Sequence, residues 1–104
     1  MKENLDKEVY IDMTLEELLN NGKKFNHIYS IIDCRGRINF HHNYIQYNPL
    51  FNEDGLTYVH EMIHYYHKDI GFEPPEKIIE QEAKKIYYEY KKIIDETVYN
   101  YLNR

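Results

Sequence analysis

The segment that decides the fold is residues 52–71, whose sequence is NEDGLTYVHEMIHYYHKDIG. Its first four residues supply side chains that cap the start of a helix, and Gly71 is a typical helix terminator. Between these two signals, apolar residues recur at helical spacing, at Leu56, Val59, Ile63, Tyr66 and Ile70. The segment therefore predicts an amphipathic helix that ends near Ile70 and packs one face onto a core.

This helix carries the motif His60-Glu61-Met62-Ile63-His64, which has the H-E-x-x-H pattern. Residues four apart lie one above the other on a helix, so both imidazoles can bind one cation, and zinc accepts neutral histidine nitrogen. Glu61 would lie beside the metal without binding it, where it can take a proton from the attacking water and pass it to a leaving amine. A helix with two surface histidines and a glutamate is the structural alternative, because so short a string also occurs by chance. The capped helix around the motif favours the metal site.

A third metal ligand must come from outside the motif. In one class of zinc peptidase a third histidine lies six residues after the second, with a glycine between them, but these positions are Ile70 and His67 here. His67 lies on the same side of the helix as His64, yet a turn too far along to complete a tetrahedral site. We therefore expect His67 to be a histidine at the edge of the cleft or one that supports a ligand.

The other common third ligand is a glutamate on a following helix, and this chain offers Glu76, Glu80 and Glu82. Helical geometry favours Glu82 over Glu80, because Glu82 lies at the flank of the expected buried face. The chain's single alanine, Ala83, follows Glu82, and so small a residue would let the two helices approach closely. Glu82 is therefore the predicted third ligand.

The flanking segments predict an α+β fold. Downstream, Pro74 and Pro75 would begin a long C-terminal helix over residues 75–102, which no internal glycine or proline interrupts. Upstream, residues 27–33 and 37–41 are predicted as two strands that pair with each other, and residues 44–47 as a third strand or a loop. A capping box at residues 14–17 begins a short N-terminal helix over residues 14–21.

Composition limits the classes of function. A chain of 104 residues fits one domain, residues 1–104, with a single modest core. The net charge is −5 and the basic residues are scattered, which argues against nucleic acid as a partner. We expect a cytoplasmic protein without a membrane partner, because no apolar run could span a bilayer and no apolar stretch follows the N-terminal residues. Cys34 is the only cysteine, so an internal disulfide and a cysteine-built zinc site are both excluded.

Residues 60–64, together with the downstream glutamates at residues 80–83, resemble the gluzincin zinc peptidases. The length of the chain is similar to that of the minigluzincins, which are minimal soluble H-E-x-x-H peptidases, and the matching stretch runs over residues 37–94. The resemblance implies a minimal zincin-like domain with a small two- or three-stranded sheet, an H-E-x-x-H helix and a glutamate helix. It also implies that zinc is bound by His60, His64 and Glu82, with Glu61 as the general base.

The resemblance further implies a substrate and a regulated state. Ile38, Asn39 and Phe40 would form an edge strand that holds an extended polypeptide by β-augmentation, so that the protein hydrolyses peptide bonds. Minigluzincins occur in latent form with C-terminal segments over the metal site, which implies a zymogen here. We expect Asp95 or Glu96 near the metal, or a homodimer that exchanges the C-terminal helix.

Two alternatives to a peptidase remain open at this point. The first is a catalytically silent zincin-like module that binds metal or regulates a partner. The second is a structural interaction domain that binds no metal. Zinc stoichiometry separates the second from the others, and cleavage of unfolded protein separates a peptidase from a silent module.

Overall fold

Four α-helices and three short strands make up residues 13–104, the part of the chain that the computed structural model describes. In chain order they are α1 (Leu15–Asn21), the single 3-10 turn η1 (Gly22–Lys24), β1 (Asn26–Tyr29), β2 (Gly36–Asn39), β3 (Tyr44–Tyr47), α2 (Asp54–Ile70), α3 (Glu76–Glu89) and α4 (Lys91–Leu102). The predicted α+β class is confirmed. The predicted capping box is also present, since Thr14 and Glu17 each accept a hydrogen bond from the other's backbone N–H.

β3 is the central strand of the sheet, whose order is β1–β3–β2. It pairs in parallel with β1 and antiparallel with β2. The predicted pairing of the first two strands with each other is therefore wrong. The physical reason lies in β3, where Ile45 and Tyr47 are completely buried, and a strand with such alternation is stabilised by pairing along both backbone edges. Within the described residues, β2 keeps one backbone edge unpaired, which makes it an edge strand.

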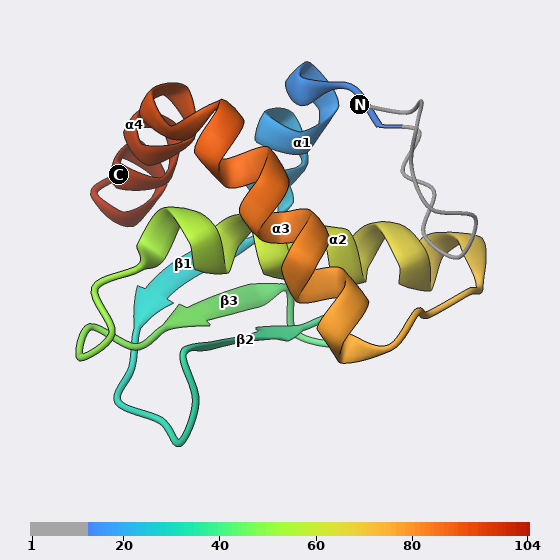
Figure 1. Ribbon diagram of the computed structural model, residues 1–104. Helices are drawn as coiled ribbons and strands as arrows, with labels where there is room; N and C mark the ends of the chain where they lie inside the picture. The colour runs from blue at the N-terminus through green and yellow to red at the C-terminus, as the bar shows by residue number, and fades with distance from the viewer. Residues whose placement is uncertain (1–12) are drawn as a thin grey trace.

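All four helices lie on the same side of the sheet, with α2 against the strands and α3 crossing over α2 (Figure 1). The predicted apolar stripe of α2 faces the core, because Leu56, Val59 and Ile63 are buried. Ile70 at its end is exposed. The predicted stop is confirmed, since Gly71 has a left-handed backbone and its N–H donates to the carbonyls of His67 and Lys68. The long α2 thus presents its middle turns to both the sheet and α3.

The predicted single helix over residues 75–102 is wrong, because the structure has two helices there. The break is at Tyr90, whose φ of −122° and ψ of 33° are not helical. A continuous helix over this range would be about 42 Å long, which exceeds the domain's longest dimension of 35 Å. The break turns α4 back so that Ile94, Val98 and Tyr101 are buried in the core.

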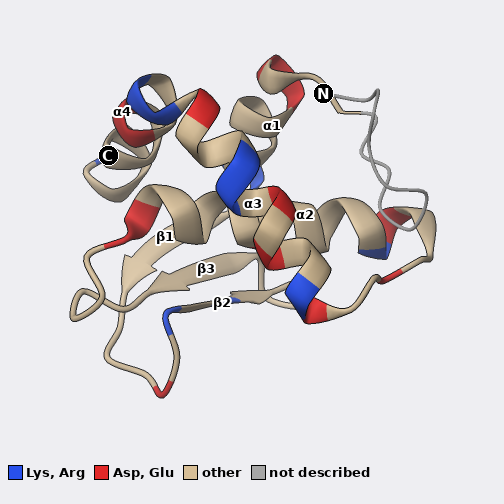
Figure 2. Ribbon diagram, viewed as in Figure 1, with Lys and Arg blue, Asp and Glu red and all other residues tan. Residues whose placement is uncertain are grey.

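Among the described residues, no helix is both long enough and apolar enough to cross a membrane. Charged residues are distributed over the helices and loops, and Figure 2 shows acidic positions along the first half of α3. This acidic stretch lies where α3 crosses α2, next to the two histidines of the H-E-x-x-H motif.

Candidate metal centre

The side chains of His60 and His64 on α2 meet the carboxylate of Glu76 on α3, and one ligand atom from each lies within 4.8 Å of the other two. Nε2 of His60 lies 2.5 Å from Oε2 of Glu76, and Nε2 of His64 lies 3.1 Å from Oε1. The two Nε2 atoms are 3.2 Å apart. Two nitrogens that bind one zinc tetrahedrally at about 2.0–2.1 Å lie roughly 3.4 Å from each other. The spacing therefore suits one shared ion.

The other ring nitrogen of each histidine is held by a second carboxylate. Nδ1 of His60 lies 2.7 Å from Oε1 of Glu80, and Nδ1 of His64 hydrogen-bonds Oε2 of Glu73. An ionised carboxylate can only accept, so each Nδ1 carries the hydrogen and donates it. In a neutral ring the lone pair is then on Nε2, the atom that faces Glu76. Metal-binding histidines in proteins are commonly oriented in this way.

The donor set of this group fits a divalent cation. With both rings neutral, two imidazole lone pairs and a carboxylate face one another, and none of these three groups can donate a hydrogen bond to another in this tautomer. Such a convergence of acceptors is electrostatically unfavourable unless a positive charge lies between them. Two nitrogens and one oxygen are ligands that zinc accepts, and three protein ligands leave a position for water or substrate. His60, His64 and Glu76 could therefore hold a catalytic type of metal ion.

Matching spacings on two helices build this arrangement. His60 and His64 are four residues apart on α2, and Glu76 and Glu80 are four residues apart on α3, so each pair lies along one helix face. His60 contacts both glutamates, whereas His64 contacts Glu76 and, beyond it, Glu73. The order of these contacts shows that the pair of histidines on α2 and the pair of glutamates on α3 run in opposite directions along the chain. The shared four-residue spacing was a signal in the sequence that would have favoured Glu76 and Glu80 together.

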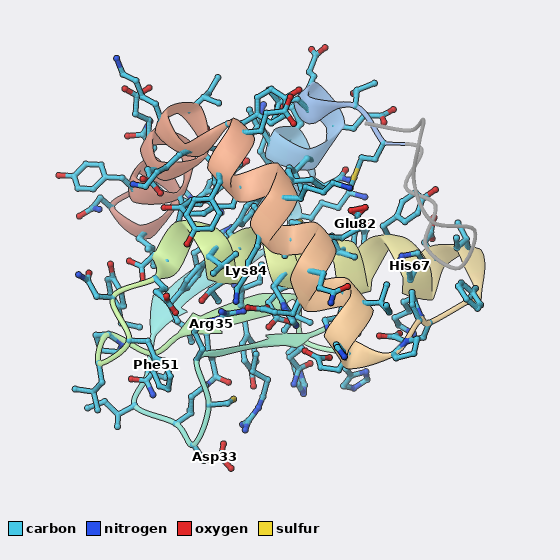
Figure 3. The ribbon with its side chains drawn as sticks, in the orientation of Figure 1. Asp33, Arg35, Phe51, His67, Glu82 and Lys84 are labelled. Atoms are coloured by element: carbon cyan, nitrogen blue, oxygen red, sulfur yellow. The ribbon has the colours of Figure 1, made fainter. Side chains whose placement is uncertain are left out.

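The structure does not bring Glu82 to the two imidazoles. Glu82 is buried on α3, with Lys85 Nζ 3.8 Å from its carboxylate. It lies about 200° around the helix from Glu80, and Figure 3 shows Glu82 and Arg35, the partner of Glu80, on opposite sides of the α3 ribbon. The assignment of Glu82 as a ligand stays a prediction, and the geometry favours Glu76 in that role.

Glu61 lies in the same cleft as the two histidines. Its side chain is buried, and burial raises the pKa of its carboxyl above the ordinary value, although the nearby His60, His64 and Arg35 act in the opposite direction. A carboxyl whose pKa is raised in a cleft can accept a proton and then release it, which is what general acid-base chemistry requires.

The cleft has a volume of about 600 Å³ and lies between the edge strand β2 and the start of α3. Ile38 and Phe40, two of the three residues expected to bind substrate, are among its lining residues. Asn39 lies between them on the strand and donates a hydrogen bond to the hydroxyl of Tyr44 instead. An extended peptide can pair with the free backbone edge of a strand such as β2.

Two other predicted neighbours of the metal lie elsewhere. His67 is buried against the rings of Tyr66 and Phe72, and neither of its ring nitrogens has a hydrogen-bond partner among the described residues. Asp95 accepts hydrogen bonds from Tyr87 and Lys91, in a different cavity from the metal group. The expectation that Asp95 approaches the metal within one chain is wrong, because the break at Tyr90 carries α4 back onto the core.

Comparison of the chain with protein-family models, with curated proteins and with solved structures gives no match. What the structure shows is a small α+β domain whose group of His60, His64 and Glu76 resembles the H-E-x-x-H…E arrangement of zincins. The carboxylates of Glu73 and Glu80, which hold the two rings, were not predicted as supports from the sequence.

Proposed function

We propose that this protein is a zinc-dependent peptidase that cleaves extended polypeptide, with the metal held by His60, His64 and Glu76. One observation carries the proposal: the two Nε2 atoms of the H-E-x-x-H pair converge on a carboxylate within a cleft that also contains Glu61 and an edge strand. A structural role for the histidines would not require both rings to direct Nε2 at the same carboxylate.

Zinc, when bound, polarises a carbonyl oxygen and makes water acidic enough to attack near neutral pH. Glu61 is the residue that moves the proton. In its ionised form it accepts a proton from the attacking water, and it then passes that proton to the leaving amine. Glu73 and Glu80 hold the two imidazoles in the tautomer that leaves Nε2 free.

The substrate class follows from the shape of the cleft. The backbone edge of β2 that is unpaired among the described residues can hydrogen-bond an extended chain, and such bonds do not depend on the side chains of the substrate. Ile38 on this strand and Phe40 just after it offer apolar contacts. A folded protein would have to expose an unpaired segment to reach the edge, so unfolded polypeptide is the expected substrate.

The test is cleavage of an unfolded protein by the zinc-loaded wild type and by Glu61→Gln. Glu61→Gln should keep its zinc and lose about 10²–10⁴-fold in rate, the usual contribution of a general base. Glu89→Gln is a matched control, because Glu89 is exposed at the end of α3. Cleavage that survives a chelator, or that is unchanged in Glu61→Gln, would contradict the proposal. Zinc binding without any cleavage would instead favour the silent metal-binding module.

A further inference from the structure

Arg35 connects the head of the edge strand to the group of histidines. It immediately precedes β2, and its guanidinium binds the Glu80 carboxylate through two nitrogens, with Nη1 3.0 Å from Oε2 and Nη2 2.7 Å from Oε1. Oε1 is the same oxygen that accepts from Nδ1 of His60. The Arg35 side chain is mostly buried, at 19 % exposure, so this contact is partly shielded from water.

Arg35 acts on His60 through Glu80 rather than directly. Its Nη2 lies 3.3 Å from Nδ1 of His60, but Nδ1 donates its hydrogen to Glu80 at the shorter distance of 2.7 Å. Two donors cannot hydrogen-bond each other, so the contact between the guanidinium and the imidazole is a side-by-side contact only. The chain of hydrogen bonds therefore runs from Arg35 to the carboxylate of Glu80, which also accepts from His60.

Hydrogen bonds also hold the backbone of Arg35. The backbone N–H of Asn48 donates to the carbonyl of Arg35 at 2.9 Å. The side-chain amide of Asn48 donates to the carbonyls of Ile32 and Cys34, at 2.9 and 3.0 Å, and Asn48 itself is buried. Asn48 thus ties the loop before β2 to the residue that follows β3. Because its backbone and its guanidinium are both held, the Arg35 side chain can keep the Glu80 carboxylate in a fixed position.

A competing cation makes the geometry of Arg35 important. Nζ of Lys84, one turn further along α3, lies 3.8 Å from Oε2 of Glu80, and its side chain is largely exposed. Without the two hydrogen bonds from Arg35, the Glu80 carboxylate could rotate outward toward Lys84. A lysine at position 35 would offer one point charge instead of a planar fork and would hold the carboxylate less well.

We propose that Arg35 is a positioning residue that holds Glu80 against Nδ1 of His60 and so ties the metal centre to the head of the edge strand β2. This inference rests on the metal-binding part of the proposed function and does not depend on peptide cleavage. It predicts that a substitution in the strand segment, with no direct contact to the metal, weakens metal binding.

The experiment is a titration of the chain of residues 1–104 with Co²⁺ and Zn²⁺, followed by the visible spectrum of bound Co²⁺ and by competition with a chelator. Arg35→Met should weaken zinc binding about 10–100-fold, as loss of support for a metal-binding histidine does, and should change the cobalt spectrum. Arg35→Lys should fall between Arg35→Met and the wild type. Arg37→Met is the control, because Arg37 is exposed on the same strand and pairs with Asp33 outside this chain of contacts. It should bind within about twofold of the wild type, the range expected for an independent site.

A double-mutant cycle with Glu80→Gln separates positioning from a general effect on the fold. If Arg35 acts through Glu80, then Arg35→Met should change zinc affinity little in the Glu80→Gln background. An equal loss in both backgrounds would overturn the proposal, and so would wild-type affinity in Arg35→Met. Circular dichroism shows whether each variant folds. If Arg35→Met does not fold, Arg35→Lys is the test: a folded Arg35→Lys with the zinc affinity and cobalt spectrum of the wild type would overturn the proposal. A wild type that binds no metal would refute the proposed function itself, which is a different outcome.

Discussion

Nε2 of His60 and Nε2 of His64 lie 3.2 Å apart, and each ring donates from its opposite nitrogen to a separate glutamate. When both rings are neutral, two unprotonated nitrogens therefore face each other beside the carboxylate of Glu76. Such a cluster costs folding free energy by itself and becomes favourable when a cation binds it. Metal affinity and the stability of the fold should therefore depend on the same few residues.

The first prediction identifies the third ligand. Glu76→Gln should lose most zinc affinity, because it removes the charge that faces both Nε2 atoms, whereas Glu82→Gln should keep it. The two variants make the same chemical change on the same helix, and Glu82 is the more buried of the two residues. Metal content after dialysis against a weak chelator decides between them. Full occupancy in Glu76→Gln with loss in Glu82→Gln would restore the ligand chosen from the sequence.

The second prediction concerns metal removal. Zinc at 100 times its dissociation constant should raise the free energy of unfolding by about 2.7 kcal/mol, because it binds the folded chain and not the unfolded one. In the variant with both His60→Ala and His64→Ala the increase should vanish. Denaturant unfolding of both proteins, with zinc and with a chelator, measures it. Equal stabilisation of the two proteins would mean that zinc binds at another place.

Local signals in the sequence were enough to predict the element that carries the motif. The capping residues before α2, its apolar stripe and Gly71 all lie within one segment, so no knowledge of the rest of the fold was needed. The same holds for the capping box of α1. These features depend on neighbours within four residues. The structure has the apolar stripe, the stop at Gly71 and the capping box of α1 where the sequence indicated, but the N-cap residue Glu53 makes no capping hydrogen bond with its side chain, so the predicted side-chain cap of α2 is not seen.

The errors, and the choice of third ligand that stays a prediction, concern features that depend on distant parts of the chain. Which face of α3 meets α2 is set by how the two helices cross, and the choice between Glu76 and Glu82 depends on it. The central position of β3 depends on pairing with two strands at once. No glycine or proline marks the break at Tyr90 in the sequence. The break allows Val98 and Tyr101 to be buried in the core, which depends on distant parts of the chain. Arg35 and Glu73 lie in loops, where periodicity gives no information.

The third prediction concerns acid stability and His27, which is buried away from the cleft. Nε2 of His27 donates to the carbonyl of Gly22, and Nδ1 accepts from the hydroxyl of Tyr47. Burial lowers the pKa of His27 below its ordinary value of 6.5. As the pH falls through 6.5, the unfolded chain therefore takes up a proton that the folded chain does not, and the stability that His27 contributes decreases, by at most about 1.4 kcal/mol per pH unit.

His27→Gln should lower the free energy of unfolding by about 1–3 kcal/mol at pH 8, where the buried hydrogen bonds are lost without any protonation effect. The difference in free energy of unfolding between the wild type and His27→Gln should become smaller as the pH falls below 6.5. Denaturant unfolding of metal-free protein at several pH values measures it. His41→Gln is the control, because His41 is exposed, and it should change the free energy of unfolding at pH 8 little. A difference in free energy of unfolding that grows as the pH falls would contradict the lowered pKa of His27.

The last prediction concerns how closely the edge strand approaches α2. A Cβ atom at Gly36, the first residue of β2, would lie 2.2 Å from Cγ2 of Thr57 and 3.0 Å from the carbonyl oxygen of Gln46. Thr57 is buried on α2, so neither side can give way easily. Gly36→Ala should therefore lower the free energy of unfolding by about 1–3 kcal/mol, the usual cost of overpacking. It should also weaken zinc binding, because it displaces the strand that begins beside Arg35.

Thr57→Ser separates this contact from a general effect on the strand. Alone, it should cost about 0.8 kcal/mol for the lost buried methyl group. Combined with Gly36→Ala, it should recover part of the stability and part of the zinc affinity, because it removes the atom that the new Cβ would strike. The contact with Gln46 remains and prevents full recovery. Unfolding and zinc titration of the four proteins give the interaction between the two substitutions, and simple additivity would show that α2 and β2 are not held together at this point.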